Sequence, residues 1–147
     1  MSGPWDHLKD RPGRLFEKPA KAKIPYVPQA LLDQYLGTIL WAETDHDEYD
    51  EYEDVPLERH YDIENFTKEA VDQAKRDIAS FLEQAGDMVD ERGEEKAMHD
   101  FWLTRSEHGA GFWDGDWPRY GDRLTEIAKR FPLVWVYVTD DGEVDFG

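Results

Sequence analysis

The stretch between residues 97 and 117 gathers side chains of the types that do chemistry. Its candidates for catalysis or ligand binding are five polar residues: His99, Asp100, Arg105, His108 and Asp114. Imidazole titrates near neutral pH, so the two histidines are candidates for an acid and a base. A guanidinium grips an anion with two hydrogen bonds. Faces for stacking come from three tryptophans: Trp102, Trp113 and Trp117. These types indicate a nucleotide- or anion-binding site, or a small enzyme.

Two alternatives for this stretch remain open. Nitrogen and oxygen donors for a metal are present in His99, Asp100, His108 and Asp114, but their spacing matches no zinc signature, so we predict no metal and no cofactor. Gly109-Ala110-Gly111 lacks the strand before it, the helix after it and the lysine of a phosphate-binding loop. The structural alternative makes the tryptophans core residues and the glycines turn residues, and buries Arg105 against an acid: Asp100, Asp114 or Asp122.

Composition narrows the class of protein. The chain has 147 residues, a net charge of −17 and no cysteine, which excludes disulfides and thiolate metal sites. Residues 1–27 carry net +3, so the remainder carries −20. Such a field repels nucleic acid and membrane surfaces and favours a basic or DNA-binding protein partner, although acidity can also serve solubility alone. Because no segment reads as a membrane span or a secretion signal, we expect a cytoplasmic protein.

The acidic charge is densest between residues 43 and 54. Eight of these twelve residues are acids, which predicts a solvated loop and a candidate acidic interaction surface: Glu43, Asp45, Asp47, Glu48, Asp50, Glu51, Glu53 and Asp54. A calcium-binding EF-hand loop needs glycine at its sixth position and glutamate at its twelfth. Counting from Asp45, those positions hold Asp50 and Pro56, so the loop fails this pattern.

Periodicity predicts the elements that position the 97–117 stretch. Residues 1–28 form an extended, basic, proline-rich arm that precedes a single domain over residues 29–147. Apolar residues at helical spacing predict four helices. The first runs from Pro28 to Trp41, and the second runs from a cap at Thr67 to Gly86. The third covers 94–104, with Ala97, Met98, Phe101 and Trp102 buried, and the fourth covers 120–131, where Pro132 ends the helix. Residues 133–139 and 143–146 read as a β-hairpin with a two-residue turn at Asp141-Gly142. The fold class is therefore α+β, with about four helices and a C-terminal hairpin.

A longer motif carries a resemblance. Residues 99–114 read HDFWLTRSEHGAGFWD, and residues 121–126 read GDRLTE. This pattern resembles the hallmark of a family of small acidic proteins from bacteriophages and prophages, in which Asn-Gly usually stands in place of Ser106-Glu107. The similarity runs over roughly residues 30–145 and includes Leu40-Trp41-Ala42, the acidic loop and the strand before Asp140-Asp141-Gly142. The resemblance implies a phage-type source, a bacterial host cell and a shared fold, and it implies no activity.

Two classes of function follow. The preferred prediction is a phage-type, acidic, non-enzymatic binding protein that modulates a host or phage factor, with DNA mimicry against host defence as one mode. Mimicry needs carboxylates in rows, and outside the acidic loop these are offered by Asp72, Asp87, Asp90 and Glu91. The alternative is an enzyme or a nucleotide- or anion-binding protein that uses the His99–Asp114 motif. Convergence of Arg105 and both histidines on an open pocket favours the alternative, whereas an Arg105 buried against a carboxylate favours a structural role.

Overall fold

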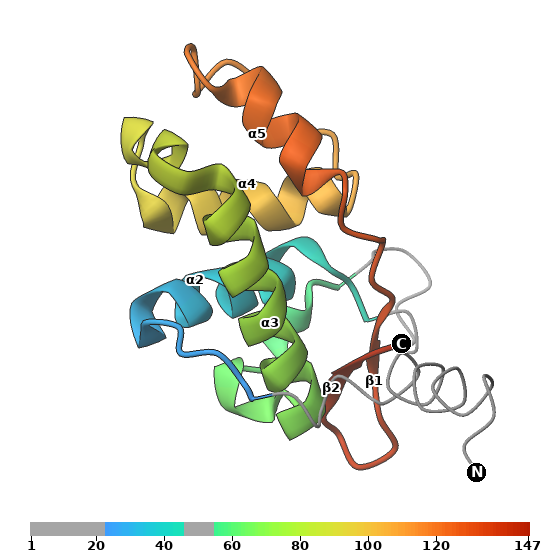
Figure 1. The fold of residues 1–147 in the computed structure, drawn as a ribbon. Helices are drawn as coiled ribbons and strands as arrows, with labels where there is room; N and C mark the ends of the chain where they lie inside the picture. Colours follow the sequence, from blue (N-terminus) through green and yellow to red (C-terminus); the bar gives the residue numbers. More distant parts are fainter. Residues whose placement is uncertain (1–22, 46–54) are drawn as a thin grey trace, which may run out of the picture.

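The computed structural model describes residues 23–45 and 55–147 (Figure 1). In chain order they form helices α2 (Gln29–Ala42), α3 (Lys68–Ala85), α4 (Glu94–Arg105) and α5 (Gly121–Ala128), followed by strands β1 (Val136–Val138) and β2 (Val144–Phe146). Single turns of 3₁₀ helix lie at Leu57–Arg59 and Ile63–Asn65, and a longer one spans Gly86–Glu91. The α+β class with four helices and a C-terminal hairpin is confirmed. Most of the predicted arm, residues 1–22, lies outside the described residues.

The predicted starts of the first two described helices are confirmed. Pro28 precedes α2, and its carbonyl accepts hydrogen bonds from the first-turn amides of Leu31 and Leu32. Thr67 caps α3, because its Oγ1 accepts from the amide of Ala70 at 3.0 Å. Gly86 ends α3 with a φ of +55°, a left-handed conformation that glycine adopts without strain.

Helix α4 is enclosed far more completely than its apolar pattern predicts. Between Ala97 and Arg105 every residue except His99 is buried. The four residues predicted to be buried are buried, and Asp100, Leu103, Thr104 and Arg105 are buried in addition. The reason is that α4 is covered by α2 on one side, by α3 and α5 on others, and by the loop that follows it (Figure 1). Polar groups on such a helix must find partners within the protein.

Aromatic rings fill the space between α4 and its neighbours. Phe101 of α4 stacks on Phe81 of α3 with ring centroids 4.2 Å apart, and Phe112 continues the stack beyond Phe81 at 5.6 Å. Trp102 meets Tyr35 of α2 edge to face at 5.6 Å. Aromatic pairs in these geometries add to the stabilisation from apolar burial. The core therefore holds α4 rigidly in place.

The hairpin and α5 are shorter than predicted. Val136 pairs with Phe146 and Val138 with Val144, so four apolar side chains share the face turned to the helices. The turn is a three-residue loop, Asp140-Asp141-Gly142, because the amide of Thr139 bonds to the carbonyl of Glu143 and the amide of Gly142 to that of Thr139. This corrects the predicted two-residue turn. Helix α5 ends at Ala128, before Pro132 is reached.

Two contacts fix the hairpin and the acidic loop to the helices. The carbonyl of Val144 in β2 accepts the amide of Thr67 at 2.9 Å, which joins the hairpin to the start of α3. The ends of the acidic loop meet, since the amide of Asp45 bonds to the carbonyl of Val55 and that of Leu57 to Glu43, each at 3.0 Å. Residues 46–54 between these ends lie outside the described residues, and six of the predicted surface acids are among them.

Candidate functional site

Among the candidate residues, Arg105 is held by the largest number of hydrogen bonds within the described part of the protein. Its side chain is 1% exposed, and its Nη1 donates to Asp77 Oδ2 at 2.7 Å and to the Tyr35 hydroxyl at 3.2 Å. Its Nη2 donates to the carbonyl of Pro132 at 2.6 Å. The guanidinium thus ties the end of α4 to α3, to α2 and to the segment before β1. The structural alternative predicted that Arg105 is buried against a carboxylate, and it is. Its partner is Asp77, however, and not one of the three acids considered from the sequence: Asp100, Asp114 and Asp122.

The environment of Arg105 stabilises its charge and suppresses that of Tyr35. The guanidinium lies over the rings of Phe101 and Phe131, 5.5 and 5.4 Å from their centroids. Burial by itself lowers the pKa of Arg105, but the adjacent Tyr35 and Asp77 outweigh it and raise that pKa above its ordinary value. Burial also raises the pKa of the Tyr35 phenol well above its usual range. At neutral pH the cluster is a buried ion pair with a neutral phenol beside it.

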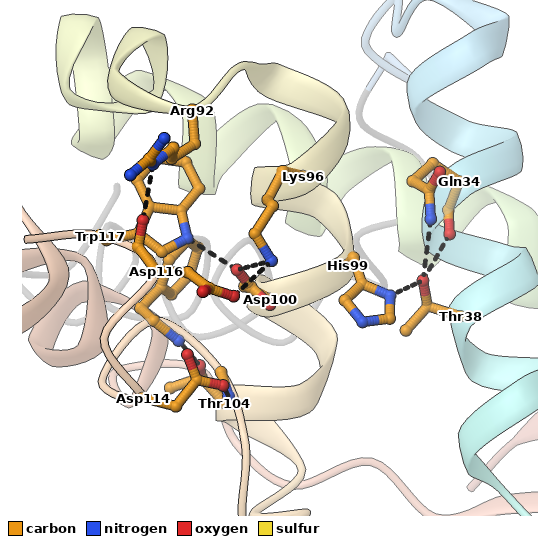
Figure 2. A network of polar contacts seen from close by, with 12 residues as sticks. Gln34, Thr38, Arg92, Lys96, His99, Asp100, Thr104, Asp114, Asp116 and Trp117 are labelled. Carbon is orange, nitrogen blue, oxygen red and sulfur yellow. Dashed lines mark hydrogen bonds and ion pairs between the residues drawn. The ribbon is translucent and has the colours of Figure 1, made fainter.

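Asp100 forms a second internal network, shown in Figure 2. Its Oδ2 accepts from the indole Nε1 of Trp117 at 2.7 Å and pairs with Lys96 Nζ at 3.2 Å. Lys96 also pairs with Asp116 at 3.0 Å, and Arg92 donates through Nε to the carbonyl of Asp116 at 2.7 Å. Burial opposes the charge on Lys96, but Asp116 and Asp100 together raise its pKa. These bonds hold the loop after α4 against the helix.

Asp114 and Gly111 shape that loop. The amide of Gly111 donates to Asp114 Oδ2 at 3.2 Å, and the next amide, that of Phe112, donates to Thr104 Oγ1 at 3.1 Å. Gly111 has a φ of +144°, and a Cβ at this position would lie 2.1 Å from Thr104 Oγ1. Glycine is therefore needed because the loop backbone touches α4. The carboxylate of Asp114 closes a turn.

The two histidines lie on the opposite side of α4, toward α2. His99 Nδ1 is 3.1 Å from Thr38 Oγ1, and its ring lies 5.5 Å from that of Trp41 (Figure 2 shows the Thr38 contact). Thr38 Oγ1 also lies 2.8 Å from the carbonyl of Gln34, so the hydroxyl connects His99 to the backbone of α2. His108 Nε2 donates to Glu43 Oε1 at 2.6 Å.

A hollow of about 270 Å³, which we call the histidine hollow, lies beside His108. It is lined by Trp41, Ala42, Leu103, His108 and Ala110. Arg105 does not line it, because its guanidinium is turned toward α3. The structure therefore brings the two histidines to one face and separates them from Arg105, Asp100 and Asp114. The convergence that the enzyme or anion-binding alternative needs is not formed.

The tryptophans also differ in how far they are exposed to solvent. Trp102 and Trp117 are buried in the core, whereas Trp113 is 52% exposed. Trp41, which was not among the candidates, is 54% exposed and lines the histidine hollow. Its position off the apolar stripe of α2 was the available signal. Asp77 and Tyr35 were also missed, because nothing in their spacing connects them to Arg105.

The predicted acidic rows are partly used inside the fold. Asp72 pairs with Lys68 at 2.7 Å. The carboxylate of Glu91 accepts from the amides of Arg119 and Tyr120, at 2.9 and 3.1 Å, and so holds the chain entering α5. Asp87 and Asp90 are exposed. Glu43 is held by His108, as described above.

A hollow of about 400 Å³ lies where α2 and α4 begin. It is lined by Pro28, Ala30, Leu31, Asp90, Gly93, Glu94 and Glu95. Three of these residues are acids, all exposed, and no basic residue is among the lining residues. We call Asp90, Glu94 and Glu95 the hollow carboxylates. Among the described residues no base pairs with them, and their negative charge suits a cationic side chain.

Metal-ion clusters and membrane-spanning helices are absent from the described parts of the chain. Within residues 23–45 and 55–147, no group of three histidine, aspartate or glutamate side chains is placed to hold a metal ion. None of the helices in those same ranges is long and apolar enough to cross a membrane. Comparison of the sequence and structure with protein-family models, curated proteins and solved structures finds no match.

Proposed function

We propose that this chain is a phage-type, acidic, non-enzymatic binding protein that modulates a host or phage factor, and that its partner is a basic, DNA-binding protein. The observation that carries the proposal is the hollow between the starts of α2 and α4, with its three exposed carboxylates and no basic lining residue. An arginine or lysine of a partner that enters this hollow finds carboxylate acceptors to which no base of residues 23–45 and 55–147 is paired.

The distribution of charge supports the same conclusion. The net charge is −17, and basic residues are used to neutralise carboxylates within the fold, as Arg105 does for Asp77 and Lys96 for Asp100. The surface is left with an acidic field that accelerates encounter with a basic protein and repels nucleic acid. Mimicry of DNA is the form of the proposal in which the partner uses its DNA-binding groove.

The test measures binding to purified basic DNA-binding proteins of a bacterial host, namely nucleases, restriction enzymes and polymerase factors. A triple variant, Asp90→Asn, Glu94→Gln and Glu95→Gln, neutralises the hollow carboxylates. The matched control, Asp140→Asn, Asp141→Asn and Glu143→Gln, removes the same charge at the exposed hairpin turn. We expect at least one panel member to bind, the hollow variant to weaken that binding about tenfold or more, and the control to change it little.

Several outcomes would contradict the proposal. Equal weakening by both triple variants would show that net charge alone matters, and binding that is insensitive to salt would exclude an electrostatic interface. No binding to any member of the panel would remove the proposed partner class. Competition by duplex DNA decides the mode, because a DNA mimic and DNA cannot occupy one groove together. Binding that persists in excess duplex DNA would retain the basic partner and remove mimicry.

The ligand-binding alternative now rests on a smaller set of residues. The histidine hollow places the exposed ring of Trp41 beside His108, whose Nε2 is held by Glu43. A flat ring that stacks on Trp41 is the ligand this geometry favours. Titration with nucleosides and nucleotides, followed by tryptophan fluorescence, tests it. A saturable change that is lost in Trp41→Ala and kept in Trp113→Ala supports it, and no change in the parent protein rejects it.

A further inference from the structure

A cavity of about 440 Å³ lies on the other side of α4, between α3, the end of α4 and the C-terminal hairpin. Figure 1 shows the hairpin beside the first half of α3, where this cavity is found. Its polar lining comes from Glu69, Gln73, Arg76, Asp77, Arg105 and Asp145. The segment 132–134, with Phe146, supplies an apolar wall. The volume is within the range of small-molecule sites in proteins.

Two of the three carboxylates that line the cavity already accept hydrogen bonds from other groups of the protein. Asp77 Oδ1 accepts from Gln73 Nε2 at 2.8 Å, and its Oδ2 accepts from Arg105. Asp145 Oδ1 accepts from Thr67 Oγ1 at 2.7 Å and from the amide of Phe146 at 2.8 Å. Glu69 is exposed at the mouth. The carboxylates inside the cavity are therefore fixed parts of the fold.

The guanidinium groups are less well satisfied. Arg76 donates through Nη2 to Gln73 Oε1 over a long 3.3 Å, while its Nε and Nη1 are buried with no acceptor. Arg105 Nε is also buried without an acceptor, although its two terminal nitrogens are bonded. Buried N–H groups of native proteins nearly always have a partner, and a guanidinium cannot lose its proton to avoid the need. Three donors at one cavity thus lack acceptors.

We propose that this cavity binds a small molecule through an oxyanion, a carboxylate or phosphate group, which Arg76 grips. The ligand's oxygens replace the long bond from Arg76 to Gln73, so that the guanidinium turns its Nε and Nη1 into the cavity. Arg105 stays in place, paired with Asp77. A short apolar body on the ligand packs against residues 132–134. Glu69 opposes the binding, because its negative charge lies at the mouth.

Butyrate and butyl phosphate are the probes, since they share one apolar body and differ in the oxyanion. Butylamine, with a similar body and a positive charge, is the control ligand. The readout is the nuclear magnetic resonance signal of each arginine Nε–H group in the full chain. We expect a saturable shift of the Arg76 signal with at least one oxyanion, at a Kd on the order of 1 mM or below. The probe that binds more tightly identifies the oxyanion class.

Substitutions at Arg76 and at Glu69 are expected to change the ligand affinity in opposite directions. Read from the Arg105 Nε–H signal, which every variant keeps, Arg76→Gln lowers affinity by about tenfold or more, Arg76→Lys lowers it less, and Glu69→Gln raises it. Arg123→Gln, an exposed arginine remote from the cavity lining, leaves it unchanged. No saturable shift with either oxyanion, an equal shift with butylamine, or unchanged affinity in Arg76→Gln would each overturn the proposal. Circular dichroism of each variant confirms that a loss of binding is not a loss of fold.

The outcome is independent of the proposed protein partner. The oxyanion cavity and the hollow carboxylates share no lining residue. Failure of butyrate and butyl phosphate to bind leaves the basic-partner proposal intact, and failure of that proposal leaves the cavity intact.

Discussion

The two sides of α4 use their polar residues in opposite ways. Toward α3 and the following loop, Arg105 and Asp100 are buried, and each makes several charge-assisted hydrogen bonds. Toward α2, His99 bonds to Thr38 and the nearby His108 bonds to Glu43, and His108 borders an open hollow. Residues of chemically active types therefore serve packing on one side and remain accessible on the other. Arg105 and Asp100 therefore help to hold the fold together, whereas the two histidines lie on the α2 side of the helix.

The largest expected effect comes from removing Arg105. Arg105→Ala leaves the half-buried Asp77 without its cation and removes a fully buried side chain, and we expect the free energy of unfolding to fall by about 3 kcal/mol. Urea unfolding followed by circular dichroism measures it. The control is Arg123→Ala, which removes an exposed ion pair with Glu126 and should cost about 1 kcal/mol or less. Equal effects of the two substitutions would erase the distinction between the buried and open sides.

Gly111→Ala tests the contact between the loop and α4. The added Cβ would stand 2.1 Å from Thr104 Oγ1, and the φ of +144° is strained for alanine, so we expect a loss of about 2–3 kcal/mol in thermal or urea unfolding. Gly115→Ala is the control, because its φ is +106° and a Cβ there meets nothing within 4 Å. If both alanines cost the same, backbone strain alone explains the glycine.

Asp100→Asn tests the hydrogen-bond network on the loop side of α4. The substitution weakens the bond to Trp117 and removes the charge that faces Lys96, so we expect a loss of about 1–3 kcal/mol in the free energy of unfolding. Asp116→Asn is the matched control, since it faces the same lysine but is 58% exposed. A larger effect at Asp116 than at Asp100 would show that the network depends on its outer member.

Tyr35 gives the buried side a pH dependence. Because burial raises the pKa of its phenol, the folded state holds the proton more tightly than the unfolded state, whose pKa is about 10. The contribution is therefore constant below pH about 10, and stability falls above it by up to about 1.4 kcal/mol per pH unit. Unfolding measured between neutral and alkaline pH should lose this component in Tyr35→Phe. An identical alkaline slope in both proteins would contradict the assignment.

The smallest effect is expected on the open side. His108→Ala removes a partly exposed pair with Glu43 and should change the free energy of unfolding by about 1 kcal/mol or less. A double-mutant cycle with Glu43→Gln measures the coupling between the two side chains. Coupling above about 2 kcal/mol would place this pair among the structural contacts of the protein.

Local signals in the sequence were sufficient to predict the elements. The Thr67 cap, the apolar spacing of α2 and the strand composition each act within a few residues, so they predict structure without knowledge of the fold. The turn of the hairpin was predicted one residue too short, because Asp141-Gly142 suits a two-residue turn and also the end of a three-residue loop with Gly142 at a φ of +80°.

The candidate site was less predictable because its contacts are made across the fold. Arg105 pairs with Asp77, 28 positions earlier in the sequence, and the sequence offered nearer acids with no basis for choosing. The enclosure of α4 also escaped prediction. An apolar stripe shows which face a helix buries first, but it does not show that a loop and two more helices cover the polar faces.

The closed base of the acidic loop has a consequence for how this protein can change. The backbone bonds between Glu43 and Leu57 and between Asp45 and Val55 join the two ends of that loop. Lengthening a loop whose ends are already joined costs little, on the order of 0.6 kcal/mol for each doubling of its length. Residues 46–54 are thus a position where an epitope, a fluorescent reporter or a second domain can be inserted while the helices keep their packing.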